Sequence, residues 1–226
     1  MSGKTAKPED RGAPIVPASG RYVAILAVLF AALWVALAIK PFDRHDWLLE
    51  NVLVVAAVLF VLWTWRRARL STMSYTLIFV FLCLHEVGSH YTYAEVPYDV
   101  WWKALTGSTF NSLVGWERNN FDRLIHFGYG LLLALPLREL VVPKAGVRGF
   151  WSYFLPLDIM VSTSGLYELI EWGASEAFGG DLGMAYLGTQ GDVWDAHKDM
   201  ALASTGALIA ILFAVWLDRR RKRISS

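Results

Sequence analysis

Six segments of the chain carry long, nearly uninterrupted runs of hydrophobic residues, and most of the joints between them are short and polar. A membrane-spanning helix needs roughly 20 mostly apolar residues, because each residue rises about 1.5 Å and the hydrocarbon core is about 30 Å thick. The six segments are Tyr22–Ile39, Trp47–Trp65, Met73–His90, Phe121–Val142, Phe150–Trp172 and Ala196–Leu217. The pattern predicts an all-α polytopic membrane protein with a six-helix transmembrane bundle.

Basic residues favour one orientation of these segments in the membrane. Lys and Arg are enriched in cytoplasmic loops, whereas Asp and Glu contribute little to orientation. Most of the 21 Lys and Arg residues lie before the first segment, after the second, after the fourth and after the sixth. The distribution predicts that both termini are cytoplasmic. The alternative for the first segment, a cleaved signal peptide ending near Ala36–Ala38, is disfavoured by its length.

Three regions follow from this pattern. Residues 1–20, which include three prolines and three glycines, are predicted to form a disordered cytoplasmic tail. Residues 21–218 are predicted to form the six-span transmembrane domain, and residues 219–226 a basic cytoplasmic tail.

Composition agrees with a membrane protein and excludes several other classes. Hydrophobic residues make up 55% of the chain and charged residues only 18%, against roughly a quarter charged in soluble domains. The single cysteine, Cys83, excludes an intramolecular disulfide and a cysteine zinc cluster. A formal net charge of +1 argues against nucleic acid as a partner. Membrane lipids are the expected partners, and the oligomeric state is left open.

Ionisable residues gather at the ends of four predicted spans. In the predicted topology all four ends lie at the outer face, and residues three or four apart share one face of a helix. The candidates are His85, Glu86 and His90 on the third span, Asp122 and His126 on the fourth, Glu168 and Glu171 on the fifth, and Asp192, Asp195 and Asp199 at the start of the sixth. Intramembrane ionisable groups usually face the bundle interior, so we expect one shared polar pocket.

Carboxylate and imidazole groups from several helices are typical of metal sites in helix bundles. The candidate metal ligands are His85, His90, Asp122, His126, Asp192, Asp195 and Asp199. Zinc, manganese or iron would suit such oxygen and nitrogen ligands. The candidate catalytic carboxylates are Glu86, Glu168 and Glu171. The alternative is that these residues only join helices, for example through ion pairs of Arg123 or Lys198 with Glu168 or Glu171.

Four longer motifs contain these candidates. They are His85-Glu86-x-x-Ser89-His90-Tyr91-Thr92-Tyr93, Asn119-Asn120-Phe121-Asp122-Arg123-x-x-His126-Phe127, Tyr167-Glu168-x-x-Glu171-Trp172 and Gly188-Thr189-Gln190-Gly191-Asp192-x-x-Asp195-x-x-x-Asp199. Together they resemble the YjdF-type family of bacterial inner-membrane proteins, over almost the whole chain after the tail. The resemblance implies a multi-pass protein of the inner membrane and supports the choice of site residues, but that family has no assigned activity.

A more distant resemblance is to VanZ-like membrane proteins, which are linked in some bacteria to glycopeptide resistance. Their Asp-Lys-x-x-His-Phe-x-x-Tyr motif is similar to the segment from Asp122 to Tyr129, and their Asp-x-x-x-Asn motif is similar to Asp195-x-x-x-Asp199. Arg123 replaces the lysine, Asp199 the asparagine, and Leu202 a frequent glycine. The likeness implies a cell-envelope role by analogy alone.

Two kinds of function fit the sequence. The first is a metal-assisted hydrolase of a lipid-linked or envelope substrate, in which a carboxylate such as Glu86 or Glu168 takes a proton from water. The second is non-enzymatic: a VanZ-like protein that binds or passes an amphiphilic ligand, or a structural membrane protein. Transport is less favoured, because the polar residues crowd one leaflet and no inverted repeat is evident.

Overall fold

The structure, a computed structural model, describes residues 16–180, 183 and 189–225 of the chain. These residues form eight helices and no strand, so the all-α prediction is confirmed for them. The helices are α1 (Gly20–Leu37), α2 (Arg44–Arg67), α3 (Thr72–His90), α4 (Tyr98–Thr106), α5 (Phe110–Val114), α6 (Phe121–Ala145), α7 (Trp151–Phe178) and α9 (Asp195–Ser225). Residues 1–15 of the predicted tail, Gly188 of the fourth motif and Ser226 lie outside the described residues.

Five of the described helices are long and apolar enough to cross a membrane: α1, α2, α3, α6 and α9. The fifth predicted segment coincides with α7, which has 28 residues and is long enough to span, but is not one of these five. Asp158, Glu168 and Glu171 lower the hydropathy of this helix. The last helix, α9, is 31 residues long and continues through the basic stretch that was predicted to be a separate tail.

Short polar side chains determine where the first three helices begin. Ser19 Oγ accepts the Tyr22 N–H at 3.2 Å, and Ser71 Oγ accepts the Ser74 N–H at 3.2 Å. Asp43 accepts two N–H groups at the start of α2. Ala18 is buried and its N–H donates to the Leu70 carbonyl oxygen at 3.0 Å, so the last residues of the predicted tail are held against the joint between α2 and α3.

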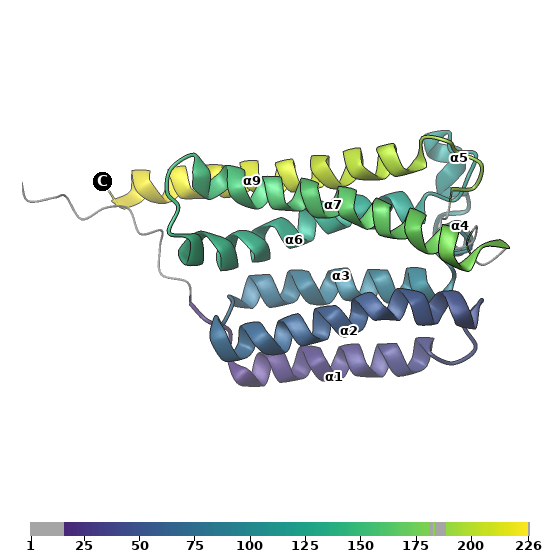
Figure 1. Ribbon diagram of the computed structural model, residues 1–226, viewed down its shortest axis with the longest axis horizontal. Helices are drawn as coiled ribbons and strands as arrows, with labels where there is room; N and C mark the ends of the chain where they lie inside the picture. The colour runs from purple at the N-terminus through teal and green to yellow at the C-terminus, as the bar shows by residue number, and fades with distance from the viewer. Residues whose placement is uncertain (1–15, 181–182, 184–188, 226) are drawn as a thin grey trace, which may run out of the picture.

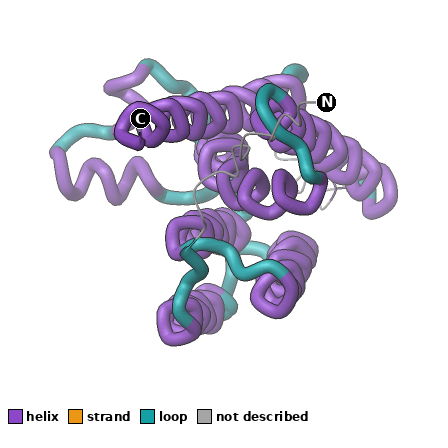
Figure 2. The backbone as a smooth tube through the Cα atoms, turned by 90° about the vertical axis from the view of Figure 1, so that its left-hand side faces the viewer, coloured by secondary structure: helices purple, strands orange, loops and turns teal. Residues whose placement is uncertain are grey.

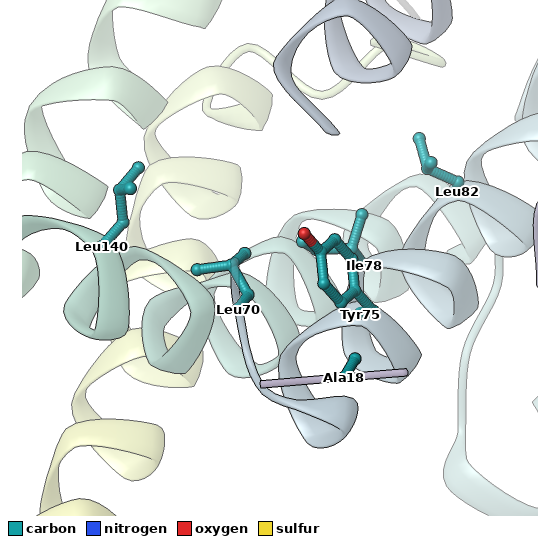
Figure 3. Packing of buried hydrophobic residues seen from close by; sticks show 6 residues of the cluster. All are labelled: Ala18, Leu70, Tyr75, Ile78, Leu82 and Leu140. Atoms are coloured by element: carbon teal, nitrogen blue, oxygen red, sulfur yellow. The ribbon is translucent and has the colours of Figure 1, made fainter. Parts of the chain in front are cut away.

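The long helices form two layers that run along the longest axis of the molecule (Figure 1). One layer contains α1, α2 and α3, and the other contains α6, α7 and α9; Figure 2 shows the two groups from the end. The layers meet where α3 packs against α6. Part of the core lies at this contact, where Tyr75 and Ile78 of α3 belong to one buried cluster with Leu140 of α6 (Figure 3).

Two glycines allow α6 and α9 to approach until their backbones touch. A Cβ added to Gly130 of α6 would overlap the Ala203 carbonyl oxygen, and one added to Gly206 of α9 would overlap the Phe127 carbonyl oxygen. Small residues at such positions are typical of helix pairs in membranes, where close packing stabilises association. This contact fixes the N-terminal part of α6 beside the first turns of α9.

The ends of four helices meet at one end of the molecule. There α3 ends, α6 begins, α7 ends and α9 begins, with the short helices α4 and α5 beside them (Figure 1). The four candidate clusters are carried by these helix ends, so the fold brings their backbones to the same end of the bundle.

Candidate functional site

A cavity of about 450 Å³ lies between α2, α3, α6 and α7 near this end. Its polar lining consists of Asp46, Glu50, His85, Thr92, Tyr93, Asp122, His126, Tyr129, Thr163, Ser164, Tyr167 and Glu171. Its apolar lining consists of Leu53, Ala57, Phe81, Leu82, Ile125, Leu166 and Ile170. The volume is within the range of ligand pockets, about 300–1,000 Å³.

At the wall of this cavity, which includes Asp122 and His126, three side chains from α6 and α9 converge. Asp122, His126 and Asp199 each offer a ligand atom, and these atoms all lie within 4.8 Å of one another. Asp122 and His126 are four residues apart on α6, so both project from one face of that helix. Asp199 reaches them from α9 because of the close contact between the two helices. This is the combination of carboxylate and imidazole groups that the sequence suggested, drawn from two of the four clusters.

His126 lies between carboxylates on both sides. Its Nε2 lies 3.5 Å from Asp122 Oδ1, and its Nδ1 lies 3.6 Å from Glu168 Oε1 on α7. The Glu168 and Asp199 side chains each have a buried oxygen without a hydrogen-bond partner among the described residues. Buried carboxylate oxygens without partners are costly, and a bound cation would satisfy them.

The cavity itself has a strong excess of acidic groups. Four of its lining residues are carboxylic acids, Asp46, Glu50, Asp122 and Glu171, whereas no Lys or Arg is found among the described residues that line it. Asp46 and Glu50 are almost completely buried, with exposed fractions of 1% and 3%. The electrostatic character of the cavity therefore favours a cation or a ligand with a positively charged group.

His85 lines the cavity, but both of its ring nitrogens are already engaged. Burial and the nearby Glu50 carboxylate raise the pKa of Tyr93 well above its usual range, so the Tyr93 hydroxyl stays protonated. That hydroxyl lies 2.5 Å from His85 Nδ1 and donates to it. The network assigns the proton of the ring to Nε2, which lies 3.3 Å from the Glu50 carbonyl oxygen. His85 is thus a hydrogen-bonded wall residue rather than a free metal ligand.

Glu86 and His90 lie outside the cavity, on the side of α3 that faces α1 and α2. Trp47 Nε1 donates to Glu86 Oε1 at 3.0 Å, and Glu86 is completely buried. His90 Nδ1 lies 2.7 Å from the Leu37 carbonyl oxygen at the end of α1. Both residues join helices of one layer. The expectation that His90 shares the pocket with the other clusters is wrong, because the face of α3 that carries Glu86 and His90 is turned toward α1 and α2 and not toward the cavity.

Asp192 and Asp195 form an ion-pair cluster with two arginines. Arg118 Nη1 donates to Asp195 Oδ1 at 2.7 Å, and Arg123 Nη2 donates to both Asp192 and Asp195. Lys198 Nζ lies 2.5 Å from Asp192 Oδ2, and this hydrogen bond is the main reason that the pKa of Asp192 falls to about 2. Arginine and lysine side chains hold these carboxylates, and neither Asp192 nor Asp195 lines the cavity, so the expected single pocket is corrected here as well.

The ion pairs named in the alternative, those of Arg123 or Lys198 with Glu168 or Glu171, are not found among the described residues. Arg123 and Lys198 pair with the carboxylates that precede and begin α9. Glu168 lies beside His126, and Glu171 lines the cavity.

Sequence reasoning missed the contribution of α2. Asp46 and Glu50 are four residues apart at the start of the second predicted span, which is the same signal that identified Asp122 and His126. Tyr93 and Arg118 were also missed as site residues. They lie in joints, where no helical spacing links them to the candidates.

Comparison with known proteins agrees with this architecture. Residues 22–220 match a family described as "Predicted membrane protein (DUF2238)". The chain is 39% identical to the inner membrane protein YjdF of Escherichia coli (strain K12) over 186 residues, which cover 82% of this chain and 85% of that protein. No solved structure matches. With five apolar helices, these similarities identify a multi-pass protein of the bacterial inner membrane.

Proposed function

The chain belongs to the DUF2238 family of predicted membrane proteins, and we propose that it is a six-span metal-dependent hydrolase of a lipid-linked or envelope substrate. In this proposal α7 is the fifth span along the chain and brings the number of spans to six. Its 28 residues extend about 42 Å, which is more than the hydrocarbon thickness. Both termini are cytoplasmic, because the basic joints then lie inside. The cavity and the cluster of Asp122, His126 and Asp199 lie at the outer face.

The observation that carries the metal proposal is the convergence of Asp122, His126 and Asp199 within 4.8 Å. Asp199 supports it independently, because this residue is 2% exposed and its Oδ1 has no hydrogen-bond partner among the described residues. One imidazole and two carboxylates, without a thiolate, suit zinc, manganese or iron. The Glu168 carboxylate is close enough to His126 to serve as a fourth ligand or to orient the imidazole ring.

Asp122, His126 and Asp199 would hold a divalent cation, which would supply Lewis acidity for hydrolysis when bound. The protein supplies the proton acceptor. Glu171 lines the cavity next to the cluster, and Glu168 is one helical turn away on α7. We assign proton transfer to this pair. Glu86 has no catalytic role in this proposal. Its carboxylate accepts a hydrogen bond from Trp47, is directed away from the cavity and positions α3 against α2.

Elemental analysis of the detergent-purified chain tests the metal site. Wild type should carry about one equivalent of zinc, manganese or iron, and His126→Ala and Asp199→Asn should lose most of it. His45→Ala is the matched control, because its side chain is 80% exposed and lies outside the cavity. A folded wild type that holds no stoichiometric metal and cannot be reloaded would overturn the proposal. Melting curves of each variant show whether it is folded.

The apolar part of the cavity supports a second candidate function, binding of an amphiphilic ligand without turnover. Phe81, Leu82 and Ile125 would contact an aliphatic group in either case. If the chain is a hydrolase, metal-loaded wild type should release a hydrolysed product and metal-loaded Glu171→Gln should not. Retention of unmodified ligand by the metal-loaded wild type favours binding alone.

A further inference from the structure

The cavity opens sideways, between α2 and α7. Leu53 of α2 and Leu166 and Ile170 of α7 line the cavity, although they are 38%, 57% and 61% exposed. Residues that both line a cavity and are exposed form its mouth. Within the described chain, α2 packs mainly against α3, and α7 packs against α6 and α9, while no comparable contact joins α2 to α7. Exposed apolar residues at this depth of a spanning bundle face lipid, so the mouth opens to the hydrocarbon.

Polarity changes along the cavity from one end to the other. On α2 the lining runs from Asp46 and Glu50 to Leu53 and Ala57, a distance of about 16 Å along the helix. On α7 the acidic residue, Glu171, lies at the same end, followed inward by Ile170 and Leu166, while the far end carries only the uncharged hydroxyl residues Thr163 and Ser164. The polar end is the end where α3 stops and α6 starts (Figure 1). A ligand that fits this gradient has a polar head and an aliphatic chain, with the head toward the membrane surface.

The charge of the polar end selects the head. Glu50 is 3% exposed, lines the cavity, and has an oxygen, Oε2, without a hydrogen-bond partner among the described residues. Asp46 lies one turn earlier on the same helix. An ammonium group would supply the missing donors, whereas an anionic head without a metal would be repelled.

We propose that the cavity binds a membrane phospholipid with a primary-amine headgroup, which enters laterally between α2 and α7. Its ammonium group donates to Glu50 and Asp46, and one acyl chain lies along Leu53 and Leu166. The inference rests on the proposed function in using the same cavity and in placing α7 in the membrane. The bound lipid is then either the substrate or a competitor of the substrate. The amine site uses acids of α2, whereas the metal cluster uses residues of α6 and α9, and both lie at the acidic end of the same cavity.

Native mass spectrometry of the full chain tests this inference. The detergent-purified protein is incubated with an equimolar mixture of phosphatidylethanolamine, phosphatidylcholine and phosphatidylglycerol of matched chains, with and without a chelator. Wild type should retain phosphatidylethanolamine about tenfold over the other two, because only its head can donate hydrogen bonds and carry a positive charge at the acids. Glu50→Gln should lose the selectivity.

A pair of tryptophan variants tests the route of entry. Leu166→Trp places a bulky ring at the mouth, whereas Leu169→Trp is on the same helix, at a residue that is 60% exposed but does not line the cavity. Leu166→Trp should lose the retained lipid and Leu169→Trp should keep it. Equal retention of all three lipids by wild type, or equal effects of the two tryptophans, would overturn the inference. Selective retention in chelator by metal-free protein sustains it even if the hydrolase proposal fails.

Discussion

Arg118 Nη1 donates to Asp195 Oδ1 at 2.7 Å, and so joins the segment before α6 to the first residue of α9. The same nitrogen donates to the Thr189 carbonyl oxygen at 2.9 Å. The Asp195 side chain is only 4% exposed, so its charge depends on this partner and on Arg123. The pairing sets the start of α9, from which Asp199 reaches the candidate metal cluster one turn later.

Replacing Arg118 with glutamine should destabilise the fold. Removing one partner of a buried ion pair costs about 3–5 kcal/mol, and we expect about 2–3 kcal/mol here because Arg123 remains at 3.3 Å. Lys198→Gln is the control, since that side chain is 49% exposed and its loss should cost less than about 1 kcal/mol. Chemical unfolding in detergent measures both. Equal losses for the two variants would contradict this account of Asp195.

Acid should weaken the same cluster through Asp192. Its pKa is lowered from the usual 3.8 to about 2, first by the hydrogen bond from Lys198, so the ionised form is favoured in the folded protein. A lowered pKa contributes stability that is complete above pH 3.8 and is lost as the pH falls through 2. Between these values the melting temperature of wild type should fall more steeply than that of Asp192→Asn. Parallel curves would show that Asp192 contributes no such dependence.

The close contact of α6 and α9 predicts a sharp difference between two glycines. Gly130→Ala should destabilise the protein by about 1–3 kcal/mol or more, because the new Cβ would overlap the Ala203 carbonyl oxygen and force the helices apart. Gly173→Ala on α7 meets nothing within 4 Å and should stabilise α7 by about 0.5–1 kcal/mol. Thermal melting of the two variants in one detergent gives the comparison, and similar melting temperatures would refute the close approach.

The proposed orientation predicts opposite signals from two reporters. A reporter fused after Ser226 should report a cytoplasmic location, and one inserted after Gly180, beyond α7, should report the outer side. The insertion after Gly180 follows α7, so this reporter also tests whether α7 spans the membrane. A cytoplasmic signal at Gly180 would place α7 outside the membrane or reverse the topology, and either would remove the candidate cavity from the outer face.

The spans were predictable because hydropathy depends on local sequence alone. Five of the six predicted segments correspond to helices that are long and apolar enough to cross the membrane. The exception, α7, has the weakest signal because Asp158, Glu168 and Glu171 lie on it. The layers were not predictable, since they depend on contacts such as those of Gly130 with Ala203 and Ala207.

The candidate site was only partly predictable for a related reason. Spacing identifies residues on one face of one helix, as for Asp122 and His126, but it does not state which neighbour that face meets. His90 and Asp192 satisfied the spacing argument and are directed at α1 and at arginines. Asp46 and Glu50 satisfy it too, and in the predicted topology the start of the second span lies at the same outer face, so the signal for α2 is present in the sequence.

The contact between α6 and α9 also limits how the molecule can move. Backbones that touch at Gly130 and Gly206 cannot roll or slide past each other without collision, so the two helices behave as one rigid unit. Any widening of the cavity therefore requires α2 or α7 to move. All the α7 residues that line it follow Pro156, whose ring removes one hydrogen bond from the helix. The backbone of α7 therefore lacks one hydrogen bond at the point where the helix enters the wall of the cavity.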